Sequence, residues 1–254
     1  MWGLLRRKTT DAMRLTSPAP GMRVYAVGDL HGRIDLFEKL RDFVGLDQRQ
    51  TPSERPLAVF LGDVIDRGPG SADIVQGLVS GDFPVPFVAL RGNHEQMLLD
   101  SLTSEVALEG WLRNGGVTTL MSYGINLSDY ALLRDVRDAM AAGIPQAHLE
   151  YMATMPTAAT SGDYFFCHAG VRPDVSLEEQ SERDLLWIRK PFLTSTRDFG
   201  KRVVHGHSPV ASPEVLPNRI NIDTGAYATG LLTCLVLDGT TVNPVRITTE
   251  DVWA

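Results

Sequence analysis

Short apolar runs alternate with stretches of helical spacing along the first hundred residues. This pattern predicts strands at 23–27, 57–61 and 87–90, and helices at 34–43, at about 71–78 and beyond Asn93. Strands that alternate with helices are typical of an α/β fold with a mostly parallel sheet. The loops at the strand ends of such a sheet are available for chemistry.

The pattern changes between about 104 and 158, where helices and turns predominate and where 111–116 reads as a helix end. Few helices separate the strand-like runs that follow, at 164–167, 202–205, 219–222, 231–237 and 242–247. We therefore expect a second, mixed sheet that packs on the first. The predicted fold is an α/β, two-sheet β-sandwich flanked by helices (α/β/β/α), with a helical insertion at about 104–158.

The start of the chain is polar and contains Ser17-Pro18-Ala19-Pro20, which predicts a flexible arm over 1–21 and a single domain over 22–254. The basic residues near Met1 have no apolar run behind them, so they do not form an export signal. No stretch of the sequence approaches the length of a membrane span. We expect a cytoplasmic protein that does not bind membranes.

Composition narrows the possible partners. The net charge of −7 argues against nucleic acid, because binding to a phosphate backbone requires a basic surface. The two cysteines, Cys167 and Cys234, provide neither a disulfide framework nor a zinc motif. Nothing in the sequence predicts the oligomeric state.

Histidines and carboxylates gather at the ends of the predicted strands. The residues in such positions are Asp29, His31, Asp63, Asp66, Asn93, His94, His168, His205 and His207. Strand ends on one edge of a parallel sheet converge in space, so these side chains can meet. So many imidazoles and carboxylates at loop starts favour a metal site. The sixth histidine, His148, falls in the helical insertion and is predicted to lie at the surface.

Five ordered segments carry a family resemblance: Gly28-Asp29-Leu30-His31-Gly32, Gly62-Asp63-Val64-Ile65-Asp66-Arg67-Gly68, Gly92-Asn93-His94-Glu95, Cys167-His168-Ala169-Gly170 and His205-Gly206-His207-Ser208-Pro209. The set resembles the calcineurin-like metallophosphoesterases and, within them, the phosphoprotein phosphatase group. The phage lambda and bacterial serine/threonine protein phosphatases of that group are similar also at 186–189 and 222–226.

The resemblance implies two divalent metal ions. Their ligands would be Asp29, His31, Asp63, Asn93, His168 and His207, with Asp63 bridging the ions. Two-metal sites hold their ions roughly 3.5–4 Å apart and lower the pKa of bound water to about 7, so that a bridging hydroxide acts as the nucleophile. Oxygen and imidazole ligands without thiolate suit manganese, iron or zinc, and the resemblance favours Mn²⁺.

The resemblance also assigns the remaining chemistry. His94 would be the general acid that protonates the leaving group, with Asp66 orienting its ring. Arg67 and Arg189 would bind the substrate phosphate through their planar guanidinium groups. His205 precedes the glycine of its motif, and we expect it to pack or to form hydrogen bonds instead of binding metal.

The implied function is hydrolysis of phosphomonoesters, with phosphoserine or phosphothreonine on proteins as the preferred substrate. A symmetrical diadenosine tetraphosphate hydrolase is the alternative, because 68–71 resembles those enzymes. They usually carry Ala at the position of Asp66 and Asp at that of Glu95, which favours the phosphatases. A non-catalytic scaffold is a third reading, whose signature would be lost ligands, and none is lost here.

Overall fold

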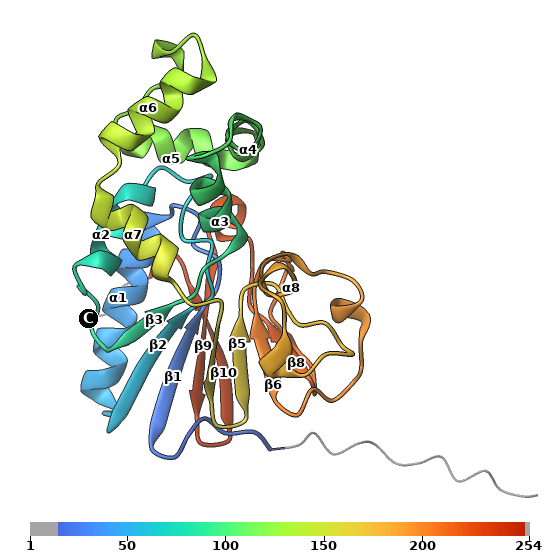
Figure 1. Ribbon diagram of the computed structural model, residues 1–254. Helices are drawn as coiled ribbons and strands as arrows, with labels where there is room; N and C mark the ends of the chain where they lie inside the picture. Colours follow the sequence, from blue (N-terminus) through green and yellow to red (C-terminus); the bar gives the residue numbers. More distant parts are fainter. Residues whose placement is uncertain (1–14, 252–254) are drawn as a thin grey trace, which may run out of the picture.

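Two mixed sheets form the centre of the computed structural model, which describes residues 15–251 (Figure 1). The first sheet has the strand order β10 (Thr241–Ile247), β9 (Leu232–Asp238), β1 (Met22–Val27), β2 (Arg55–Phe60) and β3 (Phe87–Ala89). The second has the order β4 (Ala158–Ser161), β5 (Tyr164–Cys167), β6 (Arg202–His205), β8 (Arg219–Asn221) and β7 (Glu214–Val215). The strands β1, β2 and β3 run parallel, as do β5, β6 and β8.

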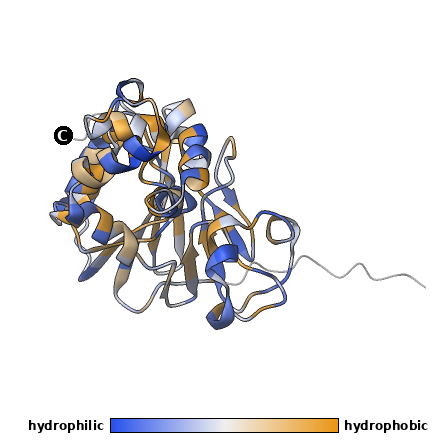
Figure 2. Ribbon diagram, turned by 45° about the horizontal axis from the view of Figure 1, so that its top comes forward, coloured by the Kyte–Doolittle hydropathy of each residue, from blue (hydrophilic) through white to orange (hydrophobic). Residues whose placement is uncertain are grey.

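Helices connect and cover the strands. Those that follow the first three strands are α1 (Ile34–Gln50), α2 (Ser71–Val79) and α3 (Asn93–Ser101). The insertion contains α4 (Glu105–Trp111), η1 (Leu112–Gly116), α5 (Val117–Ser122), η2 (Leu127–Asp129), α6 (Leu133–Gly143) and α7 (Gln146–Thr154). The second half adds η3 (Leu177–Glu179), α8 (Glu182–Trp187), η4 (Phe192–Thr194) and α9 (Ala226–Thr229). Many of the helices carry both hydrophilic and hydrophobic residues, as expected for helices with one buried face (Figure 2).

The alternation of side chains along β1 defines the layers. Val24 and Ala26 point between the two sheets and belong to a buried cluster with residues of β5 and β6. Tyr25 and Val27 point the other way, into the larger core that the helices and the insertion cover. Successive residues of a strand point to opposite faces, so one strand serves two cores.

The second sheet repeats this arrangement. Phe166 packs between the sheets, whereas Phe165 and Cys167 face outward, where Leu185 of α8 and Phe192 of η4 cover them. The predicted four-layer α/β sandwich is therefore confirmed. The carboxyl ends of the parallel strands of both sheets lie on one side of the molecule, because residues that follow β1, β2, β3 and β6 line one hollow.

Three details differ from the prediction. The runs 231–237 and 242–247 belong to the first sheet, because β9 pairs antiparallel with β1 and β10 pairs with β9. The strands β4 and β7 were not predicted. The sequence of β4 is Ala-Ala-Thr-Ser and β7 is only two residues long, so neither shows a strand pattern.

The predicted arm is partly packed on the second sheet. Thr16 is buried, and its hydroxyl lies 2.8 Å from that of Tyr164. The amide of Ser17 donates to the carboxylate of Asp163 (3.0 Å). Residues 16–19 are thus docked, whereas Leu15 is exposed, and residues 1–14 lie outside the described range. Within that range, no helix has both the length and the apolar character that a bilayer crossing requires.

His148 is buried, so its predicted surface position was wrong. It lies on α7, where the hydroxyl of Tyr123 is 2.9 Å from its Nδ1 and the side-chain oxygen of Gln76 is 3.1 Å from its Nε2. Burial lowers the pKa of this imidazole. His148 lies where the insertion contacts α2. The sequence of α7 alone does not predict this contact.

Candidate active site

A hollow of about 260 Å³ lies at the carboxyl ends of the parallel strands. Eight of the ten predicted site residues line it: Asp29, His31, Asp63, Arg67, Asn93, His94, Arg189 and His207. The other two lie next to this lining. The Oδ2 atom of Asp66 is 2.6 Å from Nδ1 of His94, and Nε2 of His168 is 2.8 Å from Oδ1 of Asn93. The structure therefore brings all ten residues together.

The backbone of these loops is unusual. Among the described residues, the non-glycine positions with positive φ are His31 (47°), Asp63 (51°), Asp66 (73°), Arg67 (69°) and His207 (64°). Every one of them is a predicted site residue. Left-handed conformations at non-glycine residues concentrate at functional sites, so the backbone supports the assignment independently of the side chains.

Four ligand-type atoms converge at one end of the hollow. Oδ1 of Asn93 lies 2.8 Å from Nδ1 of His207, and Nε2 of His168 lies 3.2 Å from the same nitrogen and 3.4 Å from Oδ1 of Asp63. A ligand 2.0–2.2 Å from a metal ion lies about 3 to 3.5 Å from its neighbours in the shell. The spacing of these four atoms therefore fits one ion.

The ring of His168 is oriented for this purpose. Its Nδ1 donates a hydrogen bond to the carbonyl of Leu61 (3.0 Å), which leaves the lone pair of Nε2 free to face the other three atoms. Burial lowers the pKa of His168 and keeps the ring neutral. A histidine that donates from one nitrogen and offers the other is typical of metal ligation.

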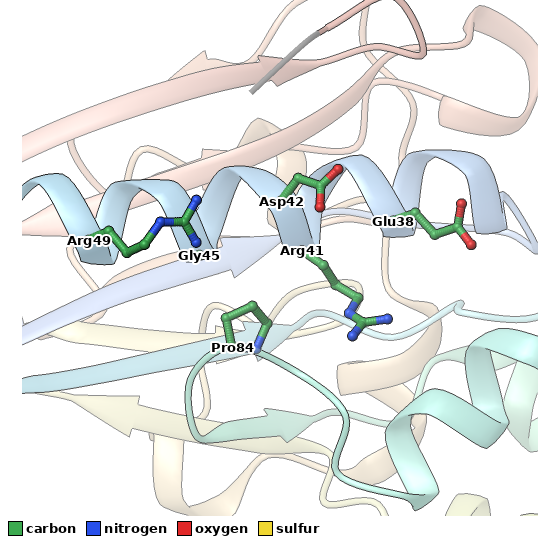
Figure 3. A pocket seen from close by; sticks show the side chains of 6 residues that line it. All are labelled: Glu38, Arg41, Asp42, Gly45, Arg49 and Pro84. Atoms are coloured by element: carbon green, nitrogen blue, oxygen red, sulfur yellow. The ribbon is translucent and has the colours of Figure 1, made fainter. Parts of the chain in front are cut away.

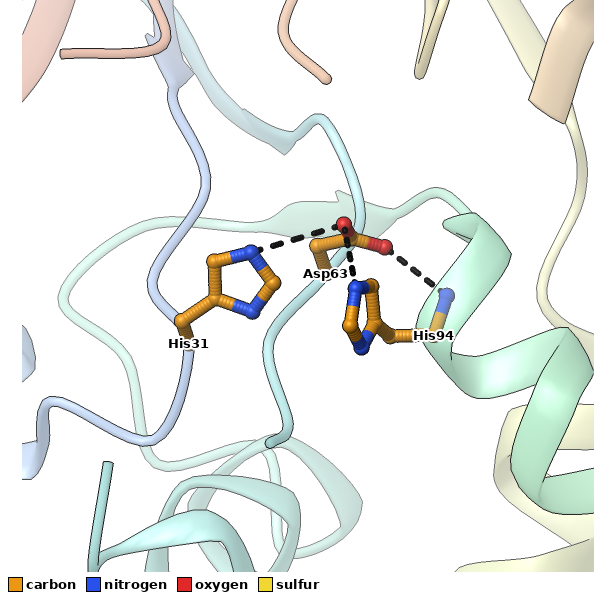
Figure 4. A group of neighbouring side chains, drawn as sticks. All are labelled: His31, Asp63 and His94. Carbon is orange, nitrogen blue, oxygen red and sulfur yellow. Dashed lines mark hydrogen bonds and ion pairs between the residues drawn. The ribbon is translucent and has the colours of Figure 1, made fainter. Parts of the chain in front are cut away.

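His31 has the same design on the other side of Asp63. Its Nδ1 donates to the carbonyl of Ile65 (3.0 Å), and its Nε2 lies 3.6 Å from Oδ2 of Asp63 (Figure 4). Burial lowers the pKa of His31 to about 3. One carboxylate oxygen of Asp63 thus faces His31 and the other faces His168, which is the geometry of a bridging ligand.

The three carboxylates that line the hollow, Asp29, Asp63 and Asp223, are all buried. Burial raises the pKa of Asp29 well above its usual range, and the charges of the other two raise it further. Burial, together with the charge of Asp63, likewise raises the pKa of Asp223 to about 6. Divalent cations would remove this repulsion, so the carboxylates fit the same metal-binding interpretation as the imidazoles.

Asp29 is fixed by a close backbone approach. Its carboxylate accepts from the amide of His207 (3.1 Å), and a β-carbon at Gly206 would lie 2.0 Å from its Oδ1. Only glycine therefore leaves room for this carboxylate. Gly92 plays the same part at Asp63, where a β-carbon would lie 2.2 Å from Oδ1.

His94 belongs to a separate hydrogen-bonded group. Its Nδ1 donates to Asp66 over 2.6 Å, and its Nε2 points into the hollow, 3.8 Å from Oδ2 of Asp63 (Figure 4). Burial opposes a charge on this ring, but Asp63 and Asp66 outweigh it and raise the pKa of His94. His94 lies close enough to His31 and Asp63 to bind an ion with them, but its raised pKa favours a proton donor.

Two residues of the insertion complete this group. Trp111 Nε1 donates to Oδ2 of Asp66 (2.8 Å), and the hydroxyl of Thr119 donates to Oδ1 (2.6 Å). The carboxylate of Asp66 is fully buried, and these donors stabilise its charge. The sequence interpretation missed both residues, because it read Trp111 only as part of a helix end. The available signal was the indole N–H of Trp111, a hydrogen-bond donor on the apolar face of a short helix.

The two predicted phosphate-binding arginines, Arg67 and Arg189, come from distant parts of the chain, and both line the hollow. Arg67 Nη2 lies 3.1 Å from Nε2 of His94, and its guanidinium stacks on the ring of Tyr227 (4.4 Å). Arg189 Nη2 lies 3.5 Å from the carbonyl of His207. Trp187 lines the hollow beside Arg189, and 42% of it is exposed, as is 41% of Tyr227. Neither Trp187 nor Tyr227 was among the predicted site residues.

Glu95 and His205 hold the loops. The Glu95 carboxylate accepts from the amides of Gly92, Asp63 and Val64 (2.8–2.9 Å). His205 is buried, and its Nδ1 donates to the carbonyl of Gly206 (3.1 Å). Both residues support ligand loops and neither lines the hollow.

A larger hollow, of about 540 Å³, lies on the outer side of α1 (Figure 3). Glu38, Arg41, Asp42 and Arg49 line it together with Gly45 and Pro84. Its charges have both signs, and it contains no histidine or other candidate metal ligand set. The chemistry is therefore assigned to the smaller hollow at the strand ends.

The sequence matches known proteins over most of its length. The calcineurin-like phosphoesterase family profile matches residues 22–229. The chain is 28% identical over 238 residues to the bis(5′-nucleosyl)-tetraphosphatase PrpE (asymmetrical) of Bacillus cereus, covering 84% of this chain and 90% of the relative. The corresponding Geobacillus protein is 28% identical over 231 residues, covering 84% and 89%.

The fold matches solved structures as well. One assigned as a diadenosine tetraphosphatase has a TM-score of 0.62 and 21% identity, covering 91% of this chain and 96% of that one. A protein serine/threonine phosphatase from Saccharomyces cerevisiae has a TM-score of 0.53 and 13% identity, covering 92% and 82%. At these identities the likeness concerns the fold alone.

Proposed function

This chain belongs to the calcineurin-like phosphoesterase family, and we propose that it is a dinuclear-metal-dependent hydrolase that cleaves dinucleoside tetraphosphates. The observation that carries the hydrolase part is the convergence of the Asp, Asn and His ligand atoms on both sides of Asp63. The names of the sequence relatives support the substrate part. The phosphatase preference drawn from the sequence motifs becomes the second candidate.

The proposed ligands divide at Asp63. Asp29 and His31 would hold one ion, and Asn93, His168 and His207 the other, with Asp63 shared between them. When bound, two divalent ions lower the pKa of water and neutralise the charge of the phosphoryl group. The oxygen and imidazole donors suit manganese, iron or zinc, and we propose manganese.

The remaining side chains act on the substrate. Arg67 and Arg189 would bind phosphate oxygens through charge-assisted hydrogen bonds, since both guanidinium groups line the hollow. His94 would donate the proton at Nε2 to the leaving group, while Asp66 and Trp111 keep the ring in place. Tyr227 holds Arg67 by stacking on its guanidinium.

The rim of the hollow supports a nucleotide substrate. Trp187 and Tyr227 expose about two-fifths of their surface there, and aromatic faces of this kind stack on nucleobases. The side chains of phosphoserine and phosphothreonine have no ring that could stack on either residue.

One observation favours phosphomonoesters, including phosphoserine and phosphothreonine, as the second candidate. The Asp66–His94 pair is well built, with a 2.6 Å bond and a raised pKa of His94. A positioned proton donor matters most when the leaving group is a basic alkoxide. A nucleotide leaves as a stable anion and needs this proton less.

The test compares three substrates on one manganese-loaded preparation: diadenosine tetraphosphate, a phosphothreonine peptide and p-nitrophenyl phosphate. We expect diadenosine tetraphosphate to have the highest kcat/KM, and all activity to disappear on chelation with metal content verified by elemental analysis. The products separate the two modes of cleavage, since symmetrical attack gives two ADP and asymmetrical attack gives ATP and AMP. A higher kcat/KM for the peptide would establish the second candidate, and activity without metal would refute the mechanism.

A further inference from the structure

A third hollow, of about 550 Å³, adjoins the active site. Trp187 and Arg189 line both hollows, so the two are neighbours. The rest of its wall consists of Arg172, Ser181, Arg183, Asp184, Ile188 and Lys190. We name this site the basic hollow.

The basic hollow has an excess of positive charge. Four of its eight lining residues are cations and one is an acid, although the whole protein has a net charge of −7. Arg172 is neutralised by Asp184 through two hydrogen bonds of 2.8 and 2.6 Å. Arg183 and Lys190 form no ion pair with any residue in 15–251, and both are exposed. Unpaired cations beside a phosphate-binding site attract further phosphate groups.

The active-site hollow alone is small for a nucleotide. Ligand pockets usually measure roughly 300–1,000 Å³, whereas this hollow measures about 260 Å³. A dinucleoside tetraphosphate brings two nucleosides and four phosphates, so most of it must lie outside. The basic hollow lies within that range of volumes, and the exposed ring of Trp187 stands between the two.

We propose that the basic hollow is the subsite for the distal nucleotide of the substrate. Arg183 and Lys190 pair with its outer phosphates, and the face of Trp187 stacks on its base. Arg189, which borders both hollows, contacts the phosphate at the junction. This subsite rests on the proposed function, because only a substrate with several phosphates extends so far.

The test uses the manganese-loaded enzyme with the double variant Arg183→Gln/Lys190→Gln. We expect the KM for diadenosine tetraphosphate to rise roughly tenfold, since each exposed charge pair contributes a few-fold in affinity, and the rise to shrink at high salt. The KM for p-nitrophenyl phosphate should rise far less, because this substrate ends at the first hollow. The control variant Lys39→Gln/Arg49→Gln removes two cations from α1 and should change neither KM.

A second measurement does not depend on tetraphosphate hydrolysis. ATP and inorganic phosphate are compared as inhibitors of p-nitrophenyl phosphate cleavage, and the inhibition constant should rise in Arg183→Gln/Lys190→Gln for ATP only. Trp187→Ala should raise the inhibition constant of ATP in the same way. Trp187→Phe should retain most of the ATP binding, because an aromatic ring remains.

The outcomes separate the two proposals. A wild-type enzyme that prefers the phosphopeptide refutes the proposed function, while the ATP comparison still tests the subsite. Equal changes for ATP and phosphate, or no change, overturn the subsite. A variant that loses turnover of an acidic phosphopeptide but keeps that of diadenosine tetraphosphate also overturns it, because the hollow would then bind peptide.

Discussion

Replacement of His94 by asparagine distinguishes a proton donor from a metal ligand. The amide of asparagine can take the place of Nδ1 beside Asp66, but it has no group at the position of Nε2 and provides no acidic proton. The other residues around Asp63 supply ligand atoms for two ions, so both ions should remain bound. The loss should therefore appear in the chemical step and depend on the leaving group.

The structure sets the size of this loss. His94 is held by a 2.6 Å bond to Asp66, whose charge Trp111 and Thr119 stabilise, so the ring is a positioned donor. Removal of such a donor costs about 10²–10⁴ in rate, or roughly 3–5 kcal/mol of transition-state stabilisation. We expect this loss for a phosphothreonine peptide, whose leaving group is a basic alkoxide. The losses for p-nitrophenyl phosphate and diadenosine tetraphosphate should be far smaller, because their leaving groups are stable anions.

The assay measures kcat for the three substrates together with metal content, and includes two companion variants. Asp66→Asn should show the same order of losses in milder form, because the ring keeps its place but loses the charge that favours its protonation. Trp111→Phe keeps the packing and removes one donor to Asp66, so its effect should be smaller still. Because the pKa of His94 is raised, its proton should persist to higher pH than the usual 6.5, and kcat for the peptide should fall only above that value.

Equal losses on all three substrates, accompanied by loss of an ion, would refute this reasoning. His94 would then be a ligand beside His31 and Asp63. An unchanged pH profile of the peptide reaction in His94→Asn would contradict the acid role even if both ions stayed bound.

Three further changes test the site and its surroundings. Gly206→Ala places a β-carbon 2.0 Å from Asp29 and should abolish metal-dependent activity and lower metal content, whereas Gly110→Ala, which meets no atom within 4 Å, should leave both unchanged. Asp63→Asn should weaken both ions in elemental analysis, while Asp29→Asn should weaken one; full occupancy in the first variant would exclude a bridge. His205 has a pKa lowered to about 3 by burial, so its contribution to stability is present above pH 6.5 and is lost as the pH falls toward 3. Denaturant titrations should show a smaller loss of unfolding free energy between pH 7 and pH 5 in His205→Gln, and an unchanged loss would exclude this account.

The sequence predicted that the candidate ligand side chains would gather at one place because of a simple geometric rule, whereas their roles as ligands came from the family resemblance. Asp29, Asp63 and Asn93 each follow a parallel strand, and such strand ends must meet at one edge of the sheet. In contrast, the periodicity of one segment does not predict which residues of other elements its side chains will contact. Trp111 and Thr119 reach Asp66 across 45 and 53 residues of sequence, so their role depended on how the insertion packs.

The same limit explains the misplaced elements. The strands β9 and β10 have strand patterns that were recognised, but the choice of sheet depends on which edge of β1 is open. His148 was predicted to lie at the surface, but α7 packs it against Gln76 of α2 and Tyr123, the residue that follows α5. Local pattern determines the element, whereas the pairing of elements is a property of the whole chain.

The left-handed backbone at the five site residues lowers the stability of the fold in favour of the geometry of the site. A non-glycine residue in this conformation costs on the order of 1–3 kcal/mol, and glycine would adopt it without that cost. A chain selected only for resistance to unfolding would carry glycine at such positions. This chain retains two histidines, two aspartates and an arginine there, so part of its folding free energy maintains the geometry of the reaction centre.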